Sequence, residues 1–131
     1  MKKIKLFFLF SIFVSGLFAQ KIKTDSVYIA KLAAKEQIQK YRIRVIKGEK
    51  MEDIARQYSQ DPGSSIKGGL YINVRKGVMD PEFEKVSFSL KQGQISEVFE
   101  TAYGYHFVQL IKRNGDLLDL RHVLIIPKEK K

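Results

Sequence analysis

The side chains of this 131-residue chain that could take part in chemistry are few and lie far apart in the sequence. Asp61 lies in a polar loop. Thr101 and His106 lie near or within one strand-like run, and His122 lies in a second such run near the C-terminus. Because the chain has no cysteine, thiol nucleophiles, disulfides and cysteine-ligated zinc sites are excluded. What remains is one carboxylate, one hydroxyl and two imidazoles.

Each candidate also has a plainer interpretation. Asp61 precedes a Pro-Gly pair, which makes it a good turn residue in any protein. His106 alternates with apolar residues, as a hydrogen-bonded core histidine does, and Met79 and Phe83 taken alone are typical of a core. Asp61 and His106 with Ser64–Ser65 suggest a hydrolase triad, but no nucleophile elbow surrounds the serines, and we set this hypothesis aside.

The N-terminus has the pattern of a secretory signal peptide. Three lysines among the first five residues precede a mostly apolar run from Leu6 to Ala19, which is short for a membrane span of about 20 residues. We therefore expect residues 1–19 to be a signal peptide, with cleavage after Ala19 and a mature chain beginning near Gln20. Retention of the segment as an anchor is the alternative.

The charge of the chain favours anionic surfaces or acidic clients over nucleic acid. Loss of the signal segment leaves 21 basic and 14 acidic residues, a net charge of +7 against +10 for the whole chain. The basic residues are spread along helical stretches and the tail, and no nucleic-acid motif is present. We expect no nucleic-acid partner, and we expect no stable membrane insertion after cleavage.

Apolar periodicity predicts a long first helix over residues 20–47. Thr24–Ser26 offers an N-cap and Gly48 a stop. One buried stripe recurs at helical spacing, and five basic residues are expected to stay in water. The stripe is Ala34, Ile38, Tyr41 and Val45, and the basic residues are Lys31, Lys35, Lys40, Arg42 and Arg44. A second, short helix is predicted over residues 50–58.

The rest of the chain alternates turns with short elements. Asp80 and Pro81 open a third helix as N-cap and first helical residue, with Phe83, Val86 and Leu90 facing inward. Strands are expected at residues 70–74, 97–101, 105–112 and 120–126. Asn-Gly at residues 114–115 is a strong hairpin signal between the last two strands.

Three motifs in this order resemble the parvulin family of peptidyl-prolyl cis/trans isomerases. They are the loop YSQDPGS…GG, the block RKGVMDPEFEKVSFSLKQGQIS and the strand ETAYGYHFVQL, which are the most specific pieces of a match that runs from Gly48 to about Lys112. The resemblance implies an α+β fold with a small antiparallel sheet flanked by about three helices. We divide the chain into a signal peptide (1–19), a long helix (20–47), a parvulin-like domain (48–126) and a charged tail (127–131).

The resemblance also implies roles for polar residues. Asp61 stands where the family carries an Asp or Cys beside the isomerised bond. Thr101 and His106 match the polar pair on and near the last strand. We expect these residues, together with His122, to form the catalytic set, with no metal and no cofactor.

Three apolar positions match the family's proline pocket. Met79 and Phe83 stand where the family lines that pocket, and Tyr71 stands at the position of a pocket leucine. The barrier to X-Pro rotation is about 18–20 kcal/mol because the C–N bond is partly double. Catalysis requires only that a twisted amide binds better than either planar form, and an apolar cup can hold the proline ring while the preceding carbonyl turns.

Two departures from the family pattern concern the sheet. The family usually continues with Gly-Gly-Asp/Glu-Leu-Gly, whereas Gly69 is followed by Leu70-Tyr71-Ile72. The family's first strand, roughly His-Ile-Leu, has no counterpart near the N-terminus. The C-terminal run LRHVLII at residues 120–126 looks like that strand, and we predict that it folds back onto residues 105–112 and takes the central place in the sheet.

Register then decides whether the two histidines meet. Side chains alternate faces, so His122 shares a face with His106 only if the numbers of paired residues sum to an even value. A three-residue loop over 114–116, pairing Arg113 with Leu117, meets this condition, and a two-residue Asn-Gly turn does not. We therefore predict the three-residue loop or a longer odd one. The same pairing between two chains would give a strand-swapped dimer instead of a monomer.

The expected function is cis/trans isomerisation of X-Pro bonds in exported proteins. The partners would be unfolded or extended proline-containing polypeptides, and the location the periplasm or cell envelope. Two alternatives stay open. One is a parvulin-like holdase chaperone with little catalytic activity, suggested by the altered segment after Gly69. The other is a module of an envelope complex that uses the long basic helix as its contact.

Overall fold

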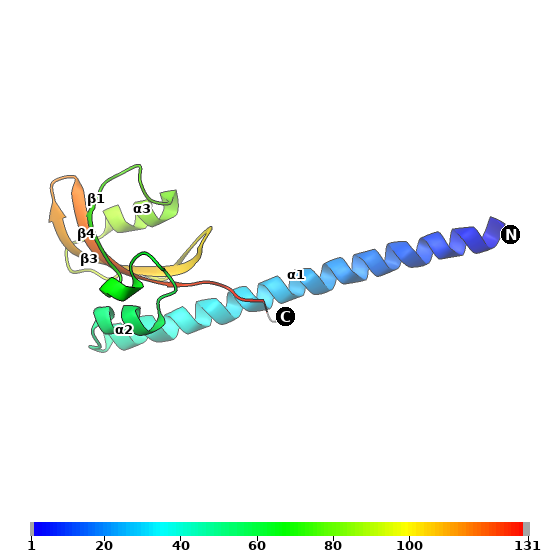
Figure 1. Ribbon diagram of the computed structural model, residues 1–131, viewed down its shortest axis with the longest axis horizontal. Coiled ribbons are helices and arrows are strands. Elements are labelled where there is room, and N and C mark those ends of the chain that lie inside the picture. Colours follow the sequence, from blue (N-terminus) through cyan, green and yellow to red (C-terminus); the bar gives the residue numbers. More distant parts are fainter. Residues whose placement is uncertain (1, 130–131) are drawn as a thin grey trace.

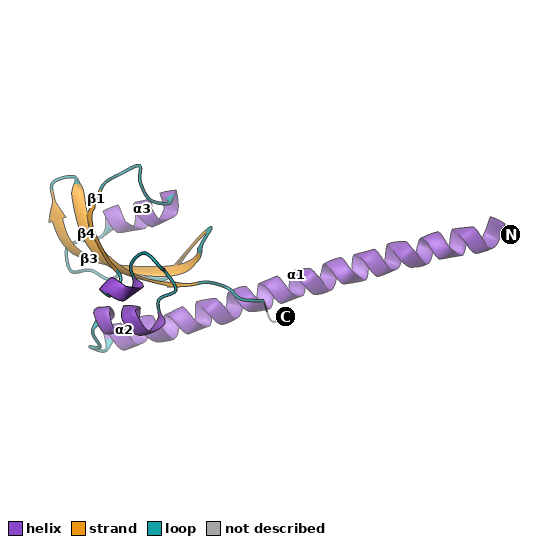
Figure 2. Ribbon diagram, in the orientation of Figure 1, coloured by secondary structure: helices purple, strands orange, loops and turns teal. Residues whose placement is uncertain are grey.

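The fold is α+β, as expected, and the described part of the chain has three α-helices and a four-stranded antiparallel sheet (Figures 1 and 2). The computed structural model describes the backbone of residues 2–129 and the side chains of residues 14–129. In chain order the elements are α1 (Lys2–Ile46), α2 (Met51–Tyr58), the short 3-10 helix η1 (Ser65–Lys67), β1 (Leu70–Val74), α3 (Pro81–Ser89), β2 (Phe99–Thr101), β3 (Gly104–Asn114) and β4 (Leu117–Ile125). The 3-10 helix was not predicted from the sequence.

The long helix begins earlier than the sequence predicted. The expected N-cap at residues 24–26 is wrong, since α1 starts at Lys2 and continues through this segment. Thr24 Oγ1 donates to the Gln20 carbonyl at 3.0 Å, and Ser26 Oγ donates to the Lys23 carbonyl at 2.9 Å. Hydroxyls satisfied in this way sit inside a helix without capping it.

The first half of α1 projects away from the rest of the fold (Figure 1). Within the described part of the chain, no helix is both long enough and apolar enough to cross a membrane. Most of the expected signal peptide, residues 1–13, has its side chains outside the described part. Its cleavage therefore stays a prediction.

The second half of α1 packs as predicted. Ala34, Ile38 and Val45 are buried, whereas Tyr41 is only partly buried and packs against the same core. The helix stops before Gly48, whose φ is +115°. One expectation is wrong, since Arg42 does not stay in water. Its side chain is 16% exposed, and its guanidinium donates to the backbone carbonyl of Ser96 and to the Glu97 carboxylate, which ties α1 to the segment before β2.

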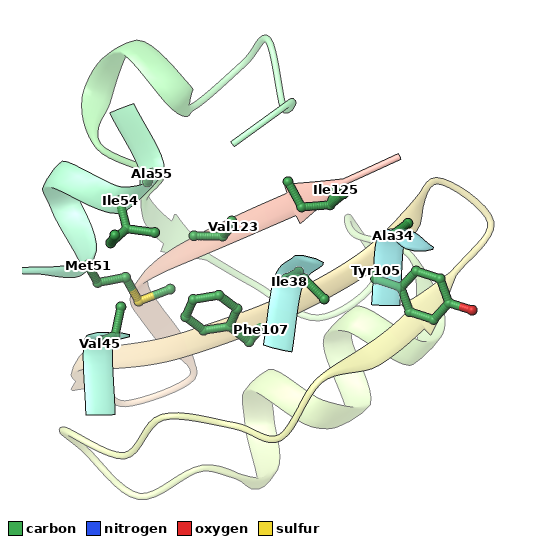
Figure 3. Close-up of a cluster of buried hydrophobic side chains, with 10 residues drawn as sticks. All are labelled: Ala34, Ile38, Val45, Met51, Ile54, Ala55, Tyr105, Phe107, Val123 and Ile125. Carbon is green, nitrogen blue, oxygen red and sulfur yellow. The ribbon is translucent and has the colours of Figure 1, made fainter. Parts of the chain in front are cut away.

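The strand order is β1-β4-β3-β2, so the C-terminal strand β4 lies in the middle of the sheet. This confirms the predicted pairing of residues 120–126 with β3 and the central place of that run. Helices α1 and α2 cover one face and α3 covers the other (Figure 1). On the α1 and α2 side, ten buried residues form one core cluster, which includes Ile38, Ile54 and Phe107 (Figure 3).

Register brings both histidines to the α3 face, although not by the predicted loop. The β3–β4 turn has two residues, Gly115 and Asp116, and pairs Asn114 with Leu117. A bulge between Leu110 and Lys112 then shifts the register by one residue. Beyond it Val108 pairs with His122 and His106 pairs with Leu124, so the paired numbers sum to an even value. The predicted three-residue loop is wrong, because the extra residue, Ile111, lies in the strand.

Local chemistry fixes the two segments that frame the α3 face. Asp80 Oδ1 accepts the backbone N–H groups of Glu82 and Phe83 at 2.9 and 3.3 Å, which confirms the predicted cap of α3. Phe83 and Leu90 are buried as expected, whereas Val86 is only partly buried and Ser87 takes the inner position.

Gly69 allows the loop after α2 to lie directly against β4. Its φ is +77°, its carbonyl accepts the backbone N–H of His122 at 3.0 Å, and a Cβ there would lie 2.2 Å from the His122 carbonyl oxygen. Only glycine fits this approach. The Gly-Gly pair is therefore part of what places His122.

Substitution of Gly69 tests this contact. Gly69→Ala and Gly77→Ala both impose a positive φ on alanine, but a Cβ at Gly77 meets nothing within 4 Å. We expect the Gly69 variant to lose about 1–3 kcal/mol more free energy of unfolding than the Gly77 variant. Urea denaturation at neutral pH measures both. Equal losses would contradict the close approach to β4.

Candidate active site

One pocket gathers every side chain that the sequence singled out. It has a volume of about 430 Å³ and opens on the α3 face of the sheet. Its lining takes in the expected polar residues Asp61, Thr101, His106 and His122 and the expected apolar residues Tyr71, Met79 and Phe83. They come from the loop after α2, from β1 to β4 and from α3, so the whole domain is needed to assemble them.

The polar residues form a continuous hydrogen-bonded chain across the pocket. Asp61 Oδ2 lies 2.8 Å from His122 Nε2, the two Nδ1 atoms of His122 and His106 lie 3.5 Å apart, and His106 Nε2 lies 2.7 Å from Thr101 Oγ1. The chain ends at the Tyr103 N–H, which donates to Thr101 Oγ1 at 3.1 Å. Loop, β4, β3 and β2 each contribute one link.

These partners fix the tautomer that each ring adopts when both rings are neutral. A carboxylate only accepts, so His122 carries its proton on Nε2 and its Nδ1 is an acceptor. His106 must then donate from Nδ1, which leaves its Nε2 to accept from the Thr101 hydroxyl. All the N–H and O–H groups of the chain therefore point towards Asp61, and every ring nitrogen has at least one partner.

Three side chains donate to the same oxygen of Asp61. His122 Nε2, Tyr71 OH at 2.7 Å and Ser64 Oγ at 2.5 Å all reach Oδ2, and the Gly63 N–H reaches Oδ1 at 3.3 Å. These hydrogen bonds, with that from His122 the strongest, hold the pKa of the Asp61 carboxyl well below its usual range. Burial and the contact with Asp61 raise the pKa of Tyr71 to about 12.

His106 is held neutral by its surroundings. It is only 4% exposed, and the Phe99 ring stacks on it with centroids 5.4 Å apart while the Phe83 ring meets it edge-on at 5.5 Å. Burial first, and the neighbouring His122 second, lower the pKa of His106 to about 4. An uncharged ring can therefore persist at neutral pH beside a carboxylate network.

An apolar cup lies beside this network. Phe83, 5% exposed, forms its floor and contacts both imidazoles, with ring centroids 5.3 Å from His122 and 5.5 Å from His106. Met79 lines one wall and the Tyr71 ring, 5.3 Å from His122, lines another. The cup is wide enough for a small ring and has a carboxylate at its edge.

Ser64, which we set aside as a nucleophile from the sequence, has a structural role in the site. Besides Asp61, its hydroxyl lies 2.9 Å from His122 Nε2, and its carbonyl accepts the N–H groups of Lys67 and Gly69. Its side chain is fully buried, so it cannot attack a substrate, and the hydrolase hypothesis finds no support in its position. It holds the loop and the carboxylate in place. The sequence signal for this role is that Ser64 follows Asp61 by three residues.

Other lining residues had no signal in the sequence. Val78, Tyr103, Leu124 and Ile126 complete the wall, and three of them, Val78, Tyr103 and Ile126, are between 40% and 69% exposed at the rim. Their place depends on how β4 and the β2–β3 turn come together. Alternation in the sequence predicts a strand but does not say which pocket its side chains reach.

Known proteins share this architecture. Residues 21–112, more than half of the chain, match the family model described as the PPIC-type PPIASE domain, or rotamase. The chain is 35% identical over 104 residues to the foldase protein PrsA of Bacillus subtilis, covering 79% of this chain and 35% of that protein. It is 44% identical over 81 residues to the chaperone SurA of Shewanella sp. strain MR-4, covering 61% of this chain and 19% of that protein.

A solved structure of a known protein is similar in fold to this chain. The peptidylprolyl isomerase PrsA from Bacillus anthracis superposes with a TM-score of 0.54 at 29% identity, over 74% of this chain and 38% of that one. The chain thus spans about a third or less of the length of the curated relatives described above.

The neutral state of His106 predicts acid sensitivity. In the unfolded chain His106 binds a proton near its ordinary pKa of 6.5, but in the folded protein only near 4. Between these values the unfolded state holds more protons, so the free energy of unfolding falls as pH falls, by about 3 kcal/mol at most. The lowered pKa of Asp61 extends the loss below pH 3.8.

Denaturation with urea at several pH values between 7 and 4 measures this effect. The matched variant is His106→Gln, which keeps a hydrogen-bonding side chain but does not titrate. For this variant we expect the His106-dependent fall in the free energy of unfolding between pH 6.5 and 4 to disappear. An unchanged slope in the variant would show that other groups cause the acid sensitivity.

Proposed function

Because the chain belongs to the PPIC-type peptidyl-prolyl isomerase family, the parvulins, we propose that it isomerises X-Pro bonds in the pocket on the α3 face. The observation that carries this proposal is the apolar cup of Met79, Phe83 and Tyr71 set directly against the Asp61 carboxylate. A ring-sized apolar site beside a polar group suits proline and its preceding carbonyl. No covalent intermediate is needed for this reaction.

In this proposal the cup binds the pyrrolidine ring, and the preceding amide turns over the polar edge. Rotation breaks the resonance that makes the amide planar, and this is easier where water is excluded. Phe83 at the floor keeps the ring fixed. The carbonyl then sweeps past Asp61, His122 and Thr101, while the ring stays in the cup.

The polar chain would act as a fixed electrostatic frame. Asp61 receives three donors on one oxygen, so its charge is held at one place and does not follow the rotating amide. Preorganised groups favour the charge distribution of the twisted amide without rearranging during the reaction. His106 would orient His122, and Thr101 would orient His106.

The clients we propose are unfolded or extended proline-containing polypeptides outside the cytoplasm. The signal-like pattern of residues 1–19 supports export. The likeness to a foldase and a chaperone, which match most of this chain, supports polypeptide clients. The periplasm or cell envelope is the proposed location, and the proposed mature protein begins near Gln20.

Exchange between cis and trans proline in a blocked peptide, followed by NMR, tests the proposal. Asp61→Ala should lower the exchange rate constant at least about tenfold, which is ~1.4 kcal/mol of barrier. The control Asp116→Ala removes a carboxylate from the β3–β4 turn, far from the pocket lining, and should keep the wild-type rate.

A pair of aromatic variants separates binding from stability. Phe83→Leu and Phe107→Leu both shrink a buried ring, but only Phe83 lines the pocket, since Phe107 belongs to the core on the other face. We expect Phe83→Leu to weaken peptide binding and Phe107→Leu to leave it unchanged. Wild-type protein that binds the peptide without catalysing exchange would favour the holdase alternative, and equal rates in Asp61→Ala and wild type would contradict the role of Asp61.

A further inference from the structure

A second cavity lies next to the proline pocket and is unused by the proposed reaction. It has a volume of about 350 Å³ and lies between α1, the β2–β3 turn and the chain that follows β4. Val27, Ala30 and Lys31 of α1 form one wall, and Ala102 and Pro127 face them. This groove, as we call it below, exists because α1 passes beneath the edge of the sheet (Figure 1).

The groove and the pocket are adjacent. Thr101, Tyr103 and Ile126 line both cavities, so that these three residues form a shared wall. Tyr103 is 68% exposed and Ile126 is 40% exposed. A chain that enters the pocket therefore meets two large, accessible apolar side chains on its way to the groove.

Two hydrogen bonds and one close backbone contact hold the shared wall in place. The Ile126 N–H donates to Gln60 Oε1 at 2.7 Å, and the Gln60 N–H donates to the Leu124 carbonyl at 2.8 Å. Gly104, with a φ of +144°, lets the chain pass so closely that a Cβ there would lie 2.5 Å from the Ile125 carbonyl oxygen. The segment after β4 is thus held at a fixed distance from the β2–β3 turn.

The groove has an apolar middle and a charged end. Val27, Ala30, Ala102 and Pro127 offer small apolar surfaces, while an ion pair between Lys31 Nζ and Glu100 Oε1, 2.6 Å apart, closes one side. That ion pair neutralises two of the three charged side chains that line the groove, and the third, Glu129, lies on the chain that follows β4. A small or medium apolar side chain fits its middle best.

We propose that the groove is a second subsite for the same polypeptide, which takes an apolar side chain a few residues away from the bound proline. This inference rests on the proposed function, since the proline must occupy the pocket for the chain to continue past Tyr103 and Ile126. An extended chain advances about 3.3 Å per residue and alternates its side chains. Such a chain can place one residue in each cavity.

Blocked peptides of two lengths test the subsite. The short probe is Ala-Ala-Pro-Ala, and the long probes add a four-residue arm containing leucine on either the N-terminal or the C-terminal side. We expect one arm, and only one, to tighten binding to the wild-type protein about tenfold by burying the leucine. NMR titration should show shifts at Val27 and Ala102 with that long probe alone.

A matched pair of variants separates the groove from general charge effects. Ala102→Arg places a long side chain in the groove, and Ala33→Arg places the same side chain on α1 at an exposed position outside it. Ala102→Arg should abolish the gain from the long probe and leave the short probe unaffected. Ala33→Arg should keep the gain.

The outcomes are distinct. A short probe that binds, with no gain from either arm or with a gain that survives in Ala102→Arg, contradicts the groove and leaves the proline pocket standing. A short probe that does not bind, with a long probe that does not bind either, contradicts the proposed function and the subsite together.

Discussion

The register of β4 against β3 is the constraint on which the site depends. Because β4 lies between β1 and β3, its residues 122–125 are buried on both faces, and a shift by one residue would exchange the two sets. In the observed register Val123 and Ile125 pack against α1 and α2, while His122 faces α3 beside His106. The same pairing thus completes a core and assembles a polar network.

The polar network of Asp61, His122 and His106 can be buried in this position because nearly all of its polar atoms have a hydrogen-bond partner. A buried imidazole or carboxylate without partners would cost several kcal/mol. Here Asp61 receives three side-chain donors on one oxygen, and each histidine nitrogen has a partner. Burial by Phe83 and Phe99 keeps His106 neutral, so its ring adds no formal charge at the bottom of the pocket.

Much of this could be predicted from the sequence, because the signals were local. Asp80 followed by Pro81 is typical of the start of a helix, so the cap of α3 was predictable. The run LRHVLII at residues 120–126 is too apolar and β-branched to lie in water, so its pairing with another strand was predictable as well. The bulge at Ile111 was not, since alternation continues on both sides of it and only tertiary packing shows the shift. The start of α1 was also missed, because Thr24 and Ser26 can bond backwards inside a helix as well as cap one.

The contacts of Tyr71 and Ser64 show a second limit. Resemblance placed Tyr71 at an apolar pocket position, where its ring does lie, but its hydroxyl also donates to Asp61. Ser64 was considered as a possible nucleophile and is a buried donor to the same oxygen. Both contacts join segments that only the folded chain brings together. Patterns along the sequence identify which residues gather, and the folded chain decides which atoms meet.

The most direct test of this account is the protonation of the two imidazole rings, measured by ¹⁵N NMR of the histidines at neutral pH. The account predicts two different neutral tautomers, with the proton on Nε2 in His122 and on Nδ1 in His106, because Asp61 can only accept and the two Nδ1 atoms face each other. Finding the proton of His106 on Nε2, or the same tautomer in both rings, would contradict it.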